Sequence, residues 1–90
     1  MATILEEMDN LYDKIYEYRT DIASHNRNKI EKRANAWKDA SGIKLAKEKE
    51  DFVRSEVAEI QEKIDYCEAE IELAYNKIKV MCFRLENGDE

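Results

Sequence analysis

The residues able to carry chemistry are few and far apart. The chain has one histidine, His25, and two cysteines, Cys67 and Cys82. It has no Cys-x-x-Cys pair and no second histidine with which to complete a structural zinc site. The cysteines lie fifteen residues apart in one expected helix, too far to bridge within a chain, so we expect free thiols. Because a rod-like helical protein offers few concave sites, we predict that the chain is not an enzyme and uses no metal or cofactor.

A group of cations around one tryptophan is the strongest candidate for a binding site. Residues 1–26 carry two basic and six acidic side chains, residues 27–49 carry eight and three, and residues 50–90 carry five and twelve. The net charge of −6 therefore combines −4, +5 and −7 along the chain. We predict that the basic segment contacts a partner protein or a nucleic acid through Arg27, Lys29, Lys32, Arg33, Trp37, Lys38, Lys44 and Lys47.

The same segment has two further interpretations. As an ordinary solvated face, its lysines would pair with nearby acidic groups, and Trp37 would pack between helices beside Ile30 and Ala34. As part of a nucleic-acid mimic, the acidic flanks would reproduce the phosphate spacing of DNA, although mimics are usually acidic throughout. If the cations hold phosphates, with Trp37 stacked on an unpaired base, binding will depend markedly on salt.

Composition and periodicity indicate that long helices position these residues. The 90-residue chain has no proline and only two glycines, too few for a fold with many tight turns. Thr3 and Glu6 fit the capping pattern of a helix start. Apolar residues then follow at alternating spacings of four and three, the repeat of a coiled coil, at Ile4, Met8, Leu11, Ile15, Tyr18, Ile22 and His25.

The repeat is expected to change phase in the middle of this first arm. The next position in the series is Lys29, whereas apolar residues resume at Ile30, Ala34 and Trp37. Residues 24–29 are also strongly polar, so we expect a stutter or a short break there. Continuity of the helix is favoured because neither glycine nor proline interrupts this stretch.

A turn separates the two arms. Asp39–Gly42 has turn composition, and Gly42 suits the left-handed position after a helix end. The second arm keeps the four–three spacing at Val53, Val57, Ile60, Ile64, Cys67, Ile71, Ala74, Ile78, Met81 and Leu85, before Asn87 and Gly88. The prediction is an all-α, coiled-coil-like antiparallel two-helix hairpin, a single domain over 1–90 with arm 3–40, turn 41–43 and arm 44–86.

The facing seams pair in more than one register. A turn centred on Ser41 places Leu11 opposite Ile71 and Ile15 opposite Cys67, and a register one heptad longer also matches. The apolar burial in an isolated two-helix hairpin is rarely enough to offset the conformational entropy that the chain loses on folding. We therefore predict self-association, most simply as a dimeric helical bundle, through the apolar residues near the termini: Leu5, Tyr12, Tyr16, Leu73, Tyr75, Val80 and Phe83.

Two stretches resemble known families. Residues 46–55, Ala-Lys-Glu-Lys-Glu-Asp-Phe-Val-Arg-Ser, lead into a Glu-Ala-Glu-rich helix and resemble small helical accessory proteins of phages and prophages. This resemblance covers residues 30–85, transfers no site, and implies a setting in nucleic-acid metabolism or host-factor interference. Residues 37–42 resemble the turn of WXG100 secretion hairpins, but Asp39 stands where that signature has glycine, and this family is set aside.

These patterns predict a non-enzymatic scaffold that self-associates and presents a basic hairpin tip to a partner. One alternative is a small nucleic-acid-binding accessory protein of a recombination or replication module. A second is an inhibitor or nucleic-acid mimic that targets a host protein. The first seven residues lack the features of a signal peptide, and no apolar run approaches a membrane span. We therefore expect a cytoplasmic location, in the host cell if the chain is phage-encoded, and no membrane partner.

Overall fold

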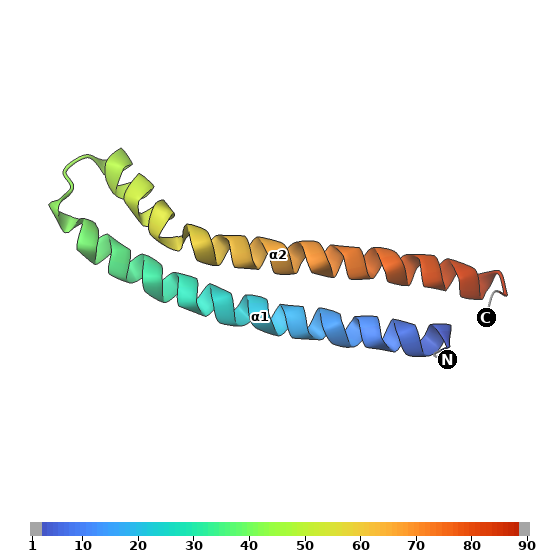
Figure 1. The fold of residues 1–90 in the computed structure, drawn as a ribbon. Helices are drawn as coiled ribbons and strands as arrows, with labels where there is room; N and C mark the ends of the chain where they lie inside the picture. The colour runs from blue at the N-terminus through green and yellow to red at the C-terminus, as the bar shows by residue number, and fades with distance from the viewer. Residues whose placement is uncertain (1–2, 89–90) are drawn as a thin grey trace.

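The fold is a hairpin of two long antiparallel helices. A computed structural model describes residues 3–88 and measures 65 × 19 × 15 Å. Helix α1 spans Ile4–Asp39, a short 3-10 helix η1 spans Ala40–Gly42, and helix α2 spans Ala46–Glu86. Figure 1 shows the two termini at one end of the rod and the turn at the other. The prediction of an all-α helical hairpin is confirmed.

Local signals in the sequence define two of the helix ends. The Thr3 side chain accepts a hydrogen bond of 3.2 Å from the Glu6 backbone N–H, which caps α1. At the other terminus Asn87 follows α2, and Gly88 adopts a φ of 76°. Gly42 has no positive φ, so the expectation of a left-handed residue there is wrong. The chain instead passes directly from α1 into η1, where Ile43 N–H bonds the Ala40 carbonyl at 2.9 Å.

The seam, the line along which α1 and α2 face each other, continues without a change of phase. Helix α1 is unbroken through residues 24–29. Lys29 is half-buried and Ala36 is 3% exposed, whereas Ile30 is 68% exposed and Trp37 46%. The predicted shift of the seam to Ile30, Ala34 and Trp37 is therefore wrong. Lys29 keeps its place because the apolar stem of a lysine covers the seam while the amine reaches a polar partner.

The two arms pair in the longer of the two registers. Ile15 is buried with Ala74 and Ile78, and Met8, Leu11, Ile71 and Cys82 pack around them. Of the two registers that the sequence allows, the one centred on Ser41, with Ile15 opposite Cys67, is therefore wrong, and the one a heptad longer is adopted. Ile43 and Leu45 have extended backbones, with ψ angles of 124° and 127°, so the connection reaches further along the chain than a turn ending at Ile43.

The rod bends towards the tip, which we define as residues 27–49. Figure 1 shows α1 curving and the first turns of α2 inclined more steeply to the rest of that helix. Just after the inclined turns, the Ser55 hydroxyl donates a hydrogen bond of 2.7 Å to the Phe52 carbonyl. Such bonds from serine to the preceding turn bend helices, and this one supplies a local cause for the inclination.

The heptad register predicts a specific cross-link. In a chain with Cys67→Ala and Cys82→Ala, the pair Ile15→Cys and Ala74→Cys should form an intrachain disulfide under mild oxidation. The control keeps native Cys67 with Ile15→Cys and Cys82→Ala. One heptad displaces the partner by about 10 Å along the axis, so this control should stay reduced. Non-reducing electrophoresis with mass spectrometry separates the two, and preferential oxidation of the control would contradict the register.

Candidate functional site

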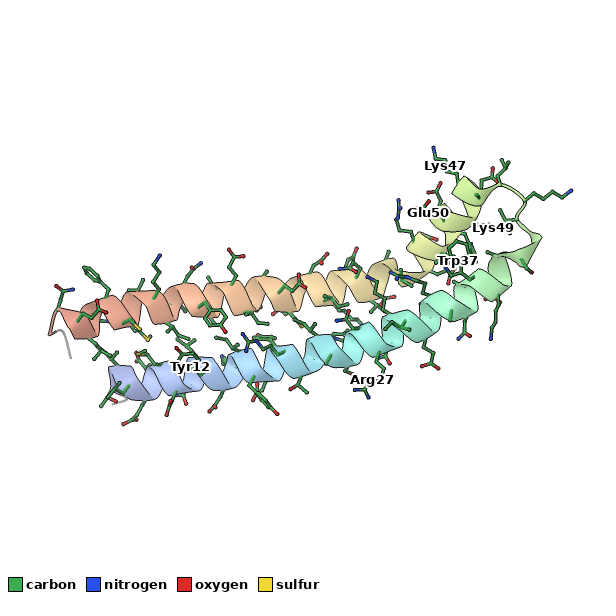
Figure 2. All side chains as sticks on the ribbon, turned by 180° about the vertical axis from the view of Figure 1, so that it is seen from behind. Tyr12, Arg27, Trp37, Lys47, Lys49 and Glu50 are labelled. Carbon is green, nitrogen blue, oxygen red and sulfur yellow. The ribbon has the colours of Figure 1, made fainter. Side chains whose placement is uncertain are left out.

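A groove opens between the two arms at the tip. It has a volume of about 910 Å³ and is lined from α1 by Lys29, Arg33 and Trp37, with Val53 and Arg54 among the α2 residues opposite. Figure 2 shows Trp37 pointing towards the inclined start of α2, near Lys49 and Glu50. The groove therefore combines an exposed indole with cations on both walls, although Glu50 and Glu62 also line the α2 wall and Arg54 is paired with Glu50.

Lys29 belongs to the seam more than to the outer surface. Its Nζ donates a hydrogen bond to Oε1 of Gln61, and Nε2 of Gln61 donates to Asp65 Oδ1 at 2.9 Å. The amine is held between the helices, where it fixes a polar contact at the inner end of the tip groove. Among the predicted contact residues, Lys29 is thus the one least free to reach a partner.

The other predicted tip cations point into solvent. All of them are exposed: Arg27, Lys32, Arg33, Lys38, Lys44 and Lys47. Figure 2 shows Arg27 directed away from α2 and Lys47 at the outer end of the rod. Within residues 3–88 the ion pair formed is that of Arg54 with Glu50, at 2.6 Å. The interpretation as an ordinary solvated face is therefore wrong in placing Trp37 in the seam beside Ile30 and Ala34, whereas the exposure of the cations agrees with it.

The predicted oligomer residues near the termini are all exposed, but they do not form one patch. Tyr75 lies beside Arg19, whose guanidinium bonds the Tyr75 hydroxyl and sits 5.7 Å from the ring centre. Leu73 instead lines a small hollow with Tyr18 and Lys14. Residues two apart in a helix point about 200° away from each other, so Leu73 and Tyr75 serve opposite sides of the hairpin.

Two names follow from these contacts. The Arg19 side is the side where Arg19 meets Tyr75 and where the tip groove opens, and the Tyr66 side is the side where Tyr18 meets Tyr66. Leu5, Tyr12 and Tyr16 precede Arg19 at helical spacings of fourteen, seven and three residues, which places them on the Arg19 side. Leu73 and Val80 follow Tyr66 at intervals of seven and lie on the Tyr66 side, and Phe83 points outward from α2.

One apolar pattern in α1 was missed by sequence reasoning. Tyr16, Ala23, Ile30 and Trp37 are spaced by seven residues, so all four return to the Arg19 side and all are exposed. With Leu5 and Tyr12 they form the outer stripe of α1. The seven-residue spacing is a feature of the sequence, but a lysine at the next seam position predicts a change of phase, which would put Ile30 and Trp37 in the seam.

The Tyr66 side is built from an aromatic contact and a buried thiol. The rings of Tyr18 and Tyr66 meet edge to face with centres 6.4 Å apart. Desolvation between the helices, then the nearby Tyr66 and Glu70, raises the pKa of Tyr18. Burial, then Asp21, raises the pKa of the Cys67 thiol, which is 5% exposed. Cys67 therefore packs in the seam, and Cys82 is the more accessible of the two free thiols.

Other kinds of site find little support in the described part of the chain. Among residues 3–88, no group of three or more His, Cys, Asp or Glu side chains is placed to hold a metal ion. None of the described helices is long and apolar enough to cross a membrane. His25 is half-buried and lines a shallow hollow with Lys63 and Cys67, as expected of a polar residue in the seam.

Comparisons with known proteins add no family to this description. No family model matches the sequence, and no curated protein or solved structure gives a match. The surfaces described above are therefore the basis for function.

The seam position of Lys29 predicts a gain in stability on its replacement. Lys29→Leu should raise the free energy of unfolding by about 1 kcal/mol, because an apolar side chain fills the seam better than an amine tethered at its edge. Gln61 keeps its bond to Asp65 in this variant. Urea unfolding at fixed protein concentration measures the change. Lys32→Leu, at an exposed position of the same helix, is the control and should shift stability by less than about 0.5 kcal/mol. A destabilised Lys29→Leu would contradict the assignment.

Proposed function

We propose that this chain is a non-enzymatic helical scaffold that self-associates and presents its basic tip to a partner with an acidic surface. The observation that carries the proposal is the balance between buried and exposed apolar residues. Among residues 3–88, the hairpin buries ten hydrophobic residues, and none of them is a large side chain that is fully enclosed. In the same part of the chain, eleven large hydrophobic residues are at least 39% exposed. Exposed apolar surface on this scale is typical of interaction sites, and a second chain would cover it.

The distribution of charge supports the role given to the tip. The tip carries a net charge of +5 at the end of the rod farthest from the termini, and its outward cations form no ion pair within residues 3–88. A compact group of unpaired cations attracts acidic surfaces and accelerates encounter with them. We therefore place the partner contact on the lysines and arginines that face away from the seam.

A nucleic acid is the second candidate partner, because Trp37 is half exposed next to Arg33. An indole beside a guanidinium is suited to stacking on an unpaired base while the cations hold phosphates. A role in a recombination or replication module of a phage, or interference with a host factor, would agree with this candidate. Trp37 is the single tryptophan of the chain, so its fluorescence reports directly on such stacking.

Self-association is the first expected outcome. Sedimentation equilibrium of the wild-type chain at micromolar concentration should give a mass that is a multiple of 10.6 kDa, with a dimer favoured. The apolar residues outside the seam supply the driving force, so association should persist in moderate salt. A monomer throughout the micromolar range would refute the scaffold.

Binding by the tip is the second expected outcome. The triple variant Lys32→Glu, Lys38→Glu, Lys44→Glu should bind a polyglutamate peptide at least about tenfold more weakly than the wild type, since each change replaces an attraction by a repulsion. The control triple, Lys63→Glu, Lys77→Glu, Lys79→Glu, makes the same charge change on exposed lysines outside the tip and should bind nearly as the wild type does.

The nucleic-acid alternative is tested by measuring the binding of a single-stranded oligonucleotide and of its duplex at increasing salt concentration. If the single strand strongly quenches Trp37 fluorescence and polyglutamate does not bind, the partner of the tip is a nucleic acid and not an acidic protein. Equal loss of binding in both triple variants would show that the tip has no special role.

A further inference from the structure

We infer that the outer stripe of α1 is the interface with a second copy of this chain, and that the two hairpins pair antiparallel. Each basic tip then lies, by its Arg19 side alone, against the acidic terminal end of the other copy, whereas Lys32, two residues after Ile30, points about 200° away from the stripe and stays available to an acidic partner. This inference rests on the proposed self-association and specifies its surface and orientation.

The outer stripe gives α1 two apolar faces. Its seam residues pack on α2, while Leu5, Tyr12, Tyr16, Ala23, Ile30 and Trp37 lie on the Arg19 side and face solvent. The stripe extends from the first turn of the helix almost to its last, over the same length as the seam. A helix with two such faces is suited to packing between two neighbours, as each helix of a four-helix bundle does.

The Arg19 side is also open enough for a second helix to approach. Arg19 is turned onto the Tyr75 ring, so its long side chain lies over α2 and not over the stripe. Ala23, near the middle of the stripe, adds only a methyl group. Towards the tip, the groove beside Trp37 and Arg33 provides a recess for apolar side chains of the incoming copy.

Charge complementarity fixes the orientation. Residues 1–26 carry a net charge of −4 and the tip a net charge of +5. A parallel pair would bring tip against tip and acidic end against acidic end. An antiparallel pair brings unlike charges together at both ends of the rod, which favours association and suppresses the parallel alternative.

The positions along the stripe agree with this orientation residue by residue. In an antiparallel pair centred near Asp21, Leu5 lies opposite Trp37 of the second copy, and Tyr12 lies opposite its Ile30. Between these apolar pairs, at the same register, Asp9 lies opposite Arg33. Every contact made with one end of the stripe is repeated at the other by the two-fold symmetry, which is the self-complementarity that a closed dimer needs.

The second apolar series, on the Tyr66 side, provides the matched control. Val80 is 59% exposed and Ile30 is 68% exposed, and both are β-branched residues within helices on opposite sides of the hairpin. We expect Ile30→Asp to raise the dissociation constant of the dimer at least about tenfold, because it places a charge opposite Tyr12 of the second copy. Val80→Asp should leave the dissociation constant nearly unchanged. Circular dichroism establishes that both variants remain helical.

The orientation is tested by charge reversal. Asp9→Arg and Arg33→Asp should each weaken the dimer at least about tenfold, since each places like charges opposite one another at two symmetric sites. The double variant Asp9→Arg, Arg33→Asp restores an attractive pair and should recover most of the affinity. Sedimentation measures the dissociation constants, and the emission of Trp37 should shift to the blue on association because Leu5 covers the indole.

The outcomes separate this inference from the proposed function. A monomeric wild-type chain refutes both. If the wild-type chain dimerises and Ile30→Asp does not weaken the dimer, whether or not Val80→Asp does, the outer stripe is not the interface. Self-association then still holds. Failure of the double reversal to recover affinity overturns the antiparallel orientation. If Ile30→Asp also loses its helicity, the charge-reversal series at exposed Asp9 and Arg33 decides the question alone.

Discussion

The whole structure depends on a single shared seam. In the part of the chain that the structure describes, α1 and α2 have one long helix each as neighbour, so a side chain buried in the seam is covered on one side by the facing helix and on the other by its own. Within residues 3–88 such a seam buries Ile15, Ala74 and Ile78 but encloses no large side chain completely. The energy available for folding is therefore modest for a chain of this length, because apolar burial must offset the ordering of two long helices. This constraint gives the exposed apolar residues their significance.

The continuity of the seam through Lys29 determines what the surface looks like. Because Lys29 and Ala36 occupy the positions facing α2, the neighbouring Ile30 and Trp37 must point outward. A polar residue inside a seam lowers stability but restricts the ways in which the helices can pair. The unchanged phase of the seam has a second effect, since it leaves Ile30 and Trp37 exposed at the tip beside its cations.

Much of the fold was predictable from the sequence, and the errors have identifiable causes. The four–three spacing and the capping residues Thr3 and Gly88 are local signals, and they predicted the helices correctly. The register was not determined locally, because a shift of one heptad brings apolar residues opposite apolar residues in either case. For the candidate site, the exposed tip cations followed from composition. The position of Trp37 did not, because deciding it required knowing that a lysine could occupy the seam.

The extended residues between η1 and α2 have a consequence for how this hairpin varies. The arms carry a repeat that matches itself every seven residues, so they tolerate several alignments. The length of the connector Ile43–Leu45 therefore determines which of the equivalent alignments is adopted. Insertions or deletions there would slide one arm along the other while keeping a well-formed apolar seam. The charged tip would be lengthened or shortened at the same time. Evolution of this hairpin could thus retune its partner surface by changing the connector alone.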